Sequence, residues 1–147
     1  MRVEINDIVT KDKPKIVSGD MLLVDAMSQF RTSPGSALIV EPKEKSDAYG
    51  IVTTRDIVFR GLAKGMDPES TPVSRVMTKP VLILNNLHLD LRYAALAMAN
   101  AEVEHVLVFD GEHMVGELGL HDVLVASWKE CSRKQLDHMV SDVGGGC

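Results

Sequence analysis

A seven-residue phrase occurs twice in this chain, 66 positions apart, and it constrains the fold more than any single residue does. Gly50-Ile51-Val52-Thr53-Thr54-Arg55-Asp56 is matched by Gly116-Glu117-Leu118-Gly119-Leu120-His121-Asp122. Each copy follows a short apolar run and precedes a stretch whose apolar residues have helical spacing. An internal repeat of this kind predicts a fold built from two copies of one unit. A binding cleft formed between the copies would then come as a pseudo-symmetric pair.

The apolar pattern around each phrase predicts the same order of elements in both copies, β-α-β-β-α. In the first copy these elements lie at residues 15–17, 21–30, 37–40, 48–52 and 57–65. In the second copy they lie at residues 81–84, 89–101, 105–109, 114–118 and 121–128. The sequence therefore predicts an α+β fold of two repeats, 6–66 and 73–131, with a polar linker at 67–72 and a loosely ordered tail at 132–147.

Composition limits the classes of partner. The net charge of −5 at pH 7 and the lack of a basic block argue against a nucleic-acid surface or an anionic membrane surface. No apolar run approaches the roughly 18 residues of a membrane span, and the first residues carry no apolar signal core. The two cysteines, Cys131 and Cys147, make no disulfide framework. We therefore expect a soluble cytoplasmic protein that contacts neither nucleic acid nor membrane.

Thr53 and Asp56 stand at a predicted strand-to-helix junction, and their spacing permits two roles. Thr-x-x-Asp is close to a capping box, in which the hydroxyl and the carboxylate satisfy backbone N–H groups of the first helical turn. A carboxylate at the start of a helix can also accept hydrogen bonds from a ribose diol, and free N–H groups there favour phosphate. The roles are compatible, because Thr53 can cap the helix while Asp56 points outward.

The order and duplication of these motifs resemble a tandem pair of cystathionine β-synthase (CBS) domains, a Bateman module. The resemblance rests on Gly50 to Ile57, on Arg60 to Gly65 and on Val76-Met77-Thr78, and it spans roughly residues 6 to 130. It implies two units packed sheet to sheet with pseudo-twofold symmetry and two clefts. Members typically bind AMP, ADP, ATP or S-adenosylmethionine there, associate as homodimers, and sense energy or metabolite state for an effector protein. No effector domain is recognisable in this sequence, so it resembles a standalone, non-enzymatic regulatory module with no cofactor beyond that ligand.

The resemblance also implies candidate ligand-binding residues. Asp56 and Asp122 would hold ribose, and apolar walls with backbone hydrogen bonds would suit adenine. Phosphate would meet residues just before the second strand of each copy or beside the acids. The full candidate set is Thr10, Ser36, Ile51, Thr53, Arg55, Asp56, Thr78, His105, Leu118, His121 and Asp122.

The second copy departs from the family pattern, because Gly119 replaces the usual Ser or Thr. The missing hydroxyl predicts a strong site at Asp56 and a weaker or altered one at Asp122. His105 is the best phosphate candidate, and the neighbouring Glu104 would oppose a highly charged ligand. A monophosphate or an adenosyl thioether is therefore expected in preference to a triphosphate.

Three other interpretations remain open from the residues. Catalysis has little support, since none of the five histidines lies in a His-Glu-x-x-His motif and there is no P-loop or Gly-x-Ser-x-Gly. Cys131, His138 and Cys147 could ligate a metal, but their spacing fits no zinc pattern, so no metal site is expected. A structural dimerisation or partner-binding module with degenerate ligand sites is the main alternative function. The apolar final helix, with Val123, Leu124, Val125 and Ala126, favours a homodimer in either case.

Overall fold

The computed structural model describes residues 3–9 and 14–140, which form two compact units. The first unit spans residues 14–81, and the second combines the described residues before position 10 with those from 82 onward. Each unit contains a three-stranded mixed sheet, in the orders β1-β2-β3 and β4-β5-β6. The predicted α+β fold with a duplicated β-α-β-β-α order is confirmed. The packing of the two sheets against each other stays a prediction.

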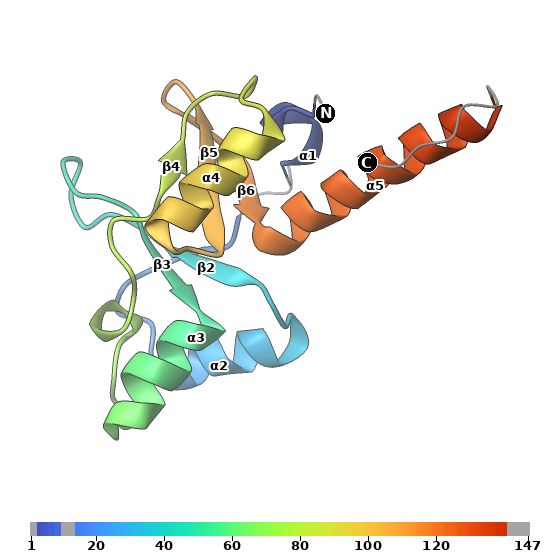
Figure 1. Ribbon diagram of the computed structural model, residues 1–147. Helices are drawn as coiled ribbons and strands as arrows, with labels where there is room; N and C mark the ends of the chain where they lie inside the picture. Colours follow the sequence, from blue (N-terminus) through green and yellow to red (C-terminus); the bar gives the residue numbers. More distant parts are fainter. Residues whose placement is uncertain (1–2, 10–13, 141–147) are drawn as a thin grey trace. The chain divides into compact units, whose positions relative to one another are not determined.

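The first unit begins with strand β1 (Ile16–Val17), helix α2 (Leu23–Thr32) and the hairpin strands β2 (Ala37–Val40) and β3 (Gly50–Thr53). A short α3 (Thr54–Asp56) follows, continued by the π-helical turn η1 (Ile57–Gly61) and the 3-10 turns η2 (Leu62–Lys64) and η3 (Val73–Arg75). Strand β1 pairs parallel with β2, and β2 pairs antiparallel with β3. Helices α2 and α3 lie together beside these strands (Figure 1).

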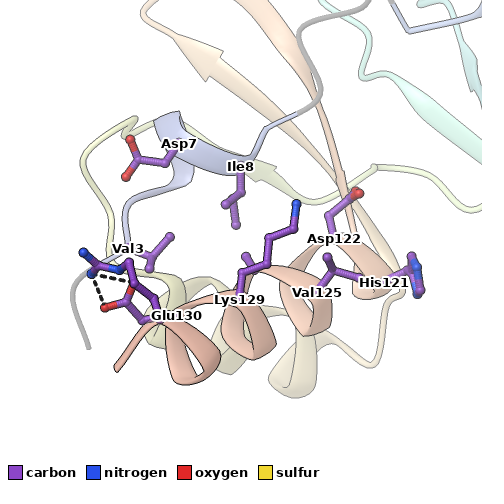
Figure 2. Close-up of a pocket in the computed structure, with 10 residues that line it drawn as sticks. Val3, Asp7, Ile8, His121, Asp122, Val125, Lys129 and Glu130 are labelled. Atoms are coloured by element: carbon purple, nitrogen blue, oxygen red, sulfur yellow. Dashed lines mark hydrogen bonds and ion pairs between the residues drawn. The ribbon is translucent and has the colours of Figure 1, made fainter. Parts of the chain in front are cut away.

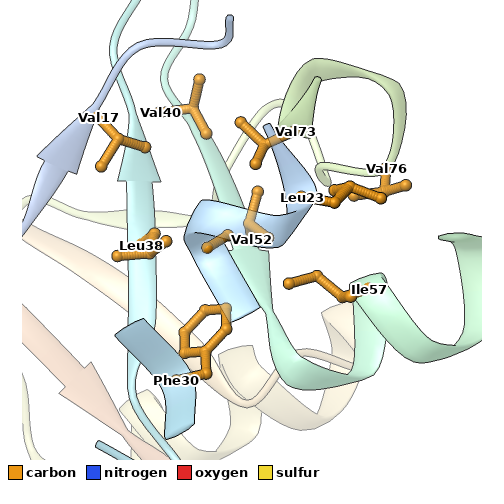
Figure 3. Packing of buried hydrophobic residues seen from close by; sticks show 10 residues of the cluster. Val17, Leu23, Phe30, Leu38, Val40, Val52, Ile57, Val73 and Val76 are labelled. Atoms are coloured by element: carbon orange, nitrogen blue, oxygen red, sulfur yellow. The ribbon is translucent and has the colours of Figure 1, made fainter. Parts of the chain in front are cut away.

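The core of the first unit is aliphatic apart from one phenylalanine. Strand residues Leu38 and Val52 pack against Leu23 and Phe30 of α2, and Ile57 closes the cluster below the motif (Figure 3). Each of these side chains is at least nine-tenths buried. Burial of a side chain of this size contributes about 1.5–3 kcal/mol, so this cluster holds the strand end that carries Thr53 in place.

The second unit repeats this arrangement with longer elements. They are α1 (Ile5–Ile8), β4 (Ile83–Leu84), α4 (Leu91–Ala101), β5 (His105–Asp110), β6 (His113–Gly119) and α5 (Leu120–Val140). Strand β4 pairs parallel with β5, and β5 pairs antiparallel with β6. Its core joins α1, α4 and the strands through Ile5, Val9, Ala94, Met98, Val106, Val108 and Leu118.

The compact units differ from the predicted boundaries in the segments that lead into each repeat. Residues 73–81 fall in the first unit, because Val73 and Val76 are buried in its core and Thr78 exchanges backbone hydrogen bonds with Ile51 at 2.8 and 2.9 Å. Correspondingly, Ile5 is buried in the second unit and its N–H donates to the Leu89 carbonyl at 2.9 Å. Residues 73–81, which precede the second repeat, therefore belong to the first unit. The described residues before position 10, which precede the first repeat, belong to the second unit. We call these two stretches the lead-in segments.

The final helix is longer than predicted. The apolar pattern predicts an end near Trp128 and a loose tail from 132, but α5 continues to Val140 and extends away from the sheet (Figure 1). No Gly or Pro interrupts residues 120–140, and strong helix formers occupy the stretch after Trp128. Glu130 and Arg133 add an ion pair at 2.7 Å along the helix. Residues 141–147 of the predicted tail lie outside the described residues.

Leu91→Ala and Leu96→Ala form a matched test of the second core, since both lie on α4. Leu91 is 2% exposed and Leu96 is 53% exposed. We expect Leu91→Ala to lower the free energy of unfolding by about 2–5 kcal/mol, because it leaves a cavity in the core. Leu96→Ala should change it by less than about 0.5 kcal/mol. Urea denaturation of both variants checks this, and equal losses would contradict the assignment of the α4 faces.

Candidate ligand-binding site

The first motif acid closes a complete capping box at the junction of β3 and α3. Asp56 Oδ2 accepts hydrogen bonds from the Thr53 backbone N–H at 2.9 Å and from the Thr53 hydroxyl at 3.2 Å. The Asp56 N–H donates in return to Thr53 Oγ1 at 3.4 Å. The predicted capping role of both residues is therefore confirmed, and it uses one of the two carboxylate oxygens.

The other carboxylate oxygen of Asp56, Oδ1, contacts Thr78 and Arg60. Thr78 donates its hydroxyl to Asp56 Oδ1 at 3.1 Å. Arg60 Nη1 lies 3.9 Å from the same oxygen and donates to the Met77 carbonyl at 3.0 Å and to Thr78 Oγ1 at 3.4 Å. The structure thus brings together Ile51, Thr53, Asp56 and Thr78 of the candidate set, and their role in ligand binding stays a prediction. Asp56 is only 8% exposed, and both of its oxygens already have protein partners.

Gly50, the first residue of the phrase, lies close to residues 77 and 78. A Cβ at this position would lie 2.8 Å from Met77 Sδ and 3.4 Å from the Thr78 carbonyl oxygen. The second distance is an ordinary contact, so a larger residue at position 50 would have to displace the flexible Met77 side chain rather than the backbone.

The second motif has the same backbone bond with fewer partners. The Gly119 N–H donates to Asp122 Oδ2 at 2.8 Å, and Gly119 offers no hydroxyl. Asp122 is half-buried, and its other oxygen has no partner among the described residues. This carboxylate therefore retains the capacity to accept hydrogen bonds from a ligand.

Gly119 lies against the imidazole of His105. Strand residue His105 pairs with Gly119 across β5 and β6, and its Nδ1 lies 3.3 Å from the position that a Gly119 Cβ would take. A side chain at position 119 would therefore require the imidazole to shift by a few tenths of an ångström. Leu118, the other neighbour proposed for adenine, is fully buried in the core of the second unit and does not line the cavity beside Asp122.

The other candidate residues, Ser36, Arg55, His121 and Thr10, make no hydrogen bond to either motif acid that the structure describes. Ser36 donates its hydroxyl to the Ser33 carbonyl at 2.6 Å, within its own turn. Arg55 is exposed, with its guanidinium 5.2 Å from the centre of the Phe59 ring. His121 is exposed beside Asp122. Thr10, the counterpart of Thr78, lies outside the described residues.

Two half-buried polar side chains at the second motif each have one buried atom without a hydrogen-bond partner among the described residues. They are Glu117 at Oε2, within the motif, and His105 at Nδ1, on the neighbouring strand. Burial lowers the pKa of His105, and Glu104 and Asp122 partly oppose that shift. Burial raises the pKa of Glu117, and the negative charge of Asp122 adds to the rise. Burial thus shifts both groups toward their neutral forms relative to an ordinary histidine and glutamate.

A cavity of about 650 Å³ opens beside Asp122, between α1 and α5 (Figure 2). Its lining consists of Val3, Asp7, Ile8, His121, Asp122, Val125, Ala126, Lys129, Glu130 and Arg133. Of these residues, only His121 and Asp122 belong to the candidate set predicted from the sequence. The sequence does show one difference between the repeats at this place. Four residues after the acid of the motif stands Arg60 in the first repeat and the small, uncharged Ala126 in the second.

The described residues contain no group of three or more His, Cys, Asp or Glu side chains placed to hold a metal ion. Of the tail residues considered as ligands, Cys147 and the side chain of His138 lie outside the described part. Among the described helices, none is long and apolar enough to cross a membrane.

Thr53→Ala tests the capping box of the first motif. The variant removes the oxygen that accepts the Asp56 N–H, so the free energy of unfolding should fall by about 1 kcal/mol. Thr53→Ser keeps the hydroxyl and should lose less than half as much. Thermal and urea denaturation measure both, and a Thr53→Ala variant as stable as the wild type would contradict the role given to Thr53.

Glu117→Gln and His105→Gln test the buried polar pair through the pH dependence of stability. Because the pKa of Glu117 is raised, its favourable contribution is present at low pH and is lost as pH rises past the ordinary glutamate value. Because the pKa of His105 is lowered, its neutral form is secure at high pH and becomes costly as pH falls below the ordinary histidine value.

Relative to wild type, Glu117→Gln should therefore be more favourable at about pH 8 than at about pH 4, and His105→Gln should be more favourable at about pH 5 than at about pH 8. Urea denaturation across this range measures both differences. Parallel pH dependences for the two variants would show that at least one environment is assigned incorrectly.

Comparisons with known proteins give the family. A CBS domain model matches residues 5–62. A CBS domain-containing protein of Bacillus subtilis, YhcV, is 36% identical over 109 residues, which cover 74% of this chain and 75% of that protein. The mitochondrial CBS domain-containing protein CBSX3 of Arabidopsis thaliana is 27% identical over 151 residues, covering 97% of this chain and 72% of that protein.

Solved structures of similar fold support the same family. A hexameric CBS-CP12 protein from bloom-forming cyanobacteria has a TM-score of 0.75 at 30% identity, covering 85% of this chain and 72% of that one. An uncharacterized conserved protein of Pyrococcus horikoshii has a TM-score of 0.73 at 26% identity, covering 86% and 93% of the two chains. With its duplicated fold and its paired motif acids, this chain belongs to the CBS domain family.

Proposed function

We propose that this CBS domain protein is a regulatory module that binds an adenosine-containing ligand through its motif acids and catalyses no reaction. The ligand is AMP, ADP, ATP or S-adenosylmethionine, and its binding would report energy or metabolite state to an effector protein. The observation that carries the proposal is the repeated placement of a carboxylate, Asp56 or Asp122, at a strand-to-helix junction. There a carboxylate can accept hydrogen bonds from the two hydroxyls of a ribose.

The sequence predicts a stronger ligand site at Asp56 than at Asp122, but the contacts of the two carboxylates favour the opposite order. Asp56 accepts from Thr53 and Thr78 and is almost fully buried. A ribose would have to displace the Thr78 hydroxyl to reach it. Asp122 has one protein hydrogen bond and borders the cavity. We therefore infer that Asp122 is the better prepared of the two for a ligand.

A thermal-shift screen tests this proposal. A ligand at about one hundred times its dissociation constant stabilises the folded state by roughly 2.7 kcal/mol, which is a shift of several degrees for a chain of this length. We expect such a shift with at least one of AMP, ADP, ATP and S-adenosylmethionine. Asp122→Asn should remove most of it and Asp56→Asn less, while Asp110→Asn, at the exposed end of β5, should leave it unchanged.

The main alternative is a dimerisation module whose ligand sites are degenerate. The complete internal satisfaction of Asp56 fits that alternative for the first repeat. Absence of a shift with all four ligands would favour it and would remove the ligand-binding proposal. Turnover of a bound nucleotide, lost in Asp122→Asn, would instead show an enzyme.

A homodimer is also proposed, on the apolar surface that follows each motif. Val58 and Leu62 are 40% and 41% exposed, and Leu124 and Trp128, at the same distances after the second acid, are 65% and 64% exposed. Around the latter two lies a hollow of about 770 Å³ that is mostly apolar. A repeated apolar surface of this kind suits a symmetric self-contact.

Trp128→Glu should convert the dimer to a monomer, because it places a charge in the apolar contact. Sedimentation equilibrium at micromolar concentration measures the mass. Tyr93→Glu, at an exposed aromatic position on α4, should keep the wild-type mass. A monomeric wild-type chain would refute the dimer without affecting the ligand proposal.

A further inference from the structure

A cysteine lies on the apolar face of α5, at the far end of the hollow around Leu124 and Trp128. Only α5 residues line this hollow of about 770 Å³: Leu120, His121, Val123, Leu124, Ser127, Trp128 and Cys131. Cys131 is half-buried and stands three residues after Trp128, so the two side chains are neighbours on the helix surface. A group attached to the sulfur of Cys131 would therefore lie against the surface proposed for the homodimer contact.

The sulfur of Cys131 is engaged in a disulfide bond. The sequence contains two cysteines, and the other one, Cys147, lies outside the described residues. Within one chain, Cys147 is therefore the only possible partner of this sulfur. A bridge between these two cysteines would tie residues 141–147 to the side of α5 that carries the hollow.

The spacing of the two cysteines permits this bridge. Cys131 lies nine residues before Val140, the end of α5, which is about 13–14 Å along the helix axis. The seven residues 141–147 can span up to about 23–25 Å when extended. They have enough length to return to Cys131 and to bring the two Cα atoms within the roughly 4.4–6.8 Å that a disulfide requires. The three glycines at 144–146 have no Cβ, so they oppose neither a turn nor a close approach to the helix.

We propose that Cys131 and Cys147 form a reversible intramolecular disulfide, which seats residues 141–147 at the Trp128 end of the hollow and so prevents the homodimer contact. The occupant of this apolar face then depends on the redox state of the two cysteines. It is the chain's own segment when they are oxidised and a second copy of the chain when they are reduced. The inference rests on the homodimer given under Proposed function and adds its regulation.

The exposed indole explains why this segment and a second copy compete. Trp128 is 64% exposed, and a tryptophan of this kind is a typical anchor of a protein interface. A bridge at Cys131 holds Cys147 and its neighbouring backbone one helical turn from the indole, where they cover part of its apolar surface. The area that drives the contact between two copies is reduced by what the chain itself has covered.

The oxidant is a low-molecular-weight disulfide, and the reaction is thiol–disulfide exchange. One protein thiolate bonds to a sulfur of the small disulfide, whose S–S bond breaks and releases one small thiolate. The second protein thiolate then attacks the protein sulfur of this mixed disulfide, and the second small thiolate leaves. Two electrons pass from the protein to the small disulfide, and the two thiol protons end on the two small thiols. A small dithiol reverses both steps.

Glutathione buffers test whether the bridge forms within one chain. Full-length wild type is equilibrated in reduced glutathione alone and in a mixture of reduced and oxidised glutathione, and both samples are quenched with acid. In the mixture we expect a chain that is lighter by two hydrogen atoms, with the peptide that contains Cys131 linked to the one that contains Cys147. Non-reducing electrophoresis should show the mass of a single chain.

Sedimentation equilibrium of the same samples tests the effect on the homodimer. The oxidised wild type should dimerise at least about tenfold more weakly than the reduced one. Cys147→Ser should dimerise equally in both buffers, because reduced glutathione reverses a mixed disulfide at Cys131, whereas the thiol of the same chain acts at an effective concentration of about millimolar. Ser141→Ala, a substitution in the same segment, should respond as wild type does. Intact mass verifies that Cys147→Ser carries no glutathione.

The outcomes separate this inference from the homodimer itself. If reduced wild type is a dimer and the mixture gives no bridge, or a bridge between two chains, the inference is overturned and the homodimer stands. A mapped intramolecular bridge that leaves the dimer as strong as before also overturns it. If reduced wild type is a monomer although the bridge forms, the homodimer is refuted and its redox regulation falls with it, while the ligand proposal is decided by the thermal-shift screen.

Discussion

One backbone-to-carboxylate hydrogen bond recurs in both repeats, and it sets the position of the acid in each candidate site. The last strand residue, Thr53 or Gly119, donates its N–H to the acid three positions later, at 2.9 and 2.8 Å. This bond ends the strand, starts the helix and holds the carboxylate at the junction. Because it uses one oxygen only, the chemistry of each site is decided by what reaches the other oxygen.

The repeats give that second oxygen two different surroundings. Around Asp56, the Thr78 hydroxyl and the Arg60 guanidinium supply donors from the protein itself. Around Asp122, the corresponding helix position is Ala126, and a cavity lined by Ala126 and Lys129 takes the place of the arginine. The same motif thus has two different surroundings. In the first repeat, Asp56 and Arg60 contact Thr78 of the preceding segment. In the second repeat, one oxygen of Asp122 can still accept a hydrogen bond from a ligand. Divergence between duplicated halves produces this without any change of fold.

Much of the fold was predictable because its signals are local. The apolar runs at Leu38 and Val106 predict buried strands, and the spacing in α4 predicts a helix, since each depends on neighbours a few residues away. The length of α5 was underestimated, although the lack of Gly and Pro up to Val140 was visible in the sequence. The exchange of lead-in segments was not predictable, because the apolar residues at Val73 and Ile5 indicate burial without indicating in which unit.

The sequence by itself determined the duplicated order of strands and helices and the placement of an acid at each strand-to-helix junction. Capping and periodicity act between residues that are close in the chain, so they can be recognised from spacing. Only the tertiary structure decided which acid is satisfied by the protein and which borders an open cavity. Thr78 reaches Asp56, and Asp7 stands opposite Lys129, through contacts between distant parts of the chain. Such contacts form only when packing of the cores brings those segments together, and no local pattern encodes them.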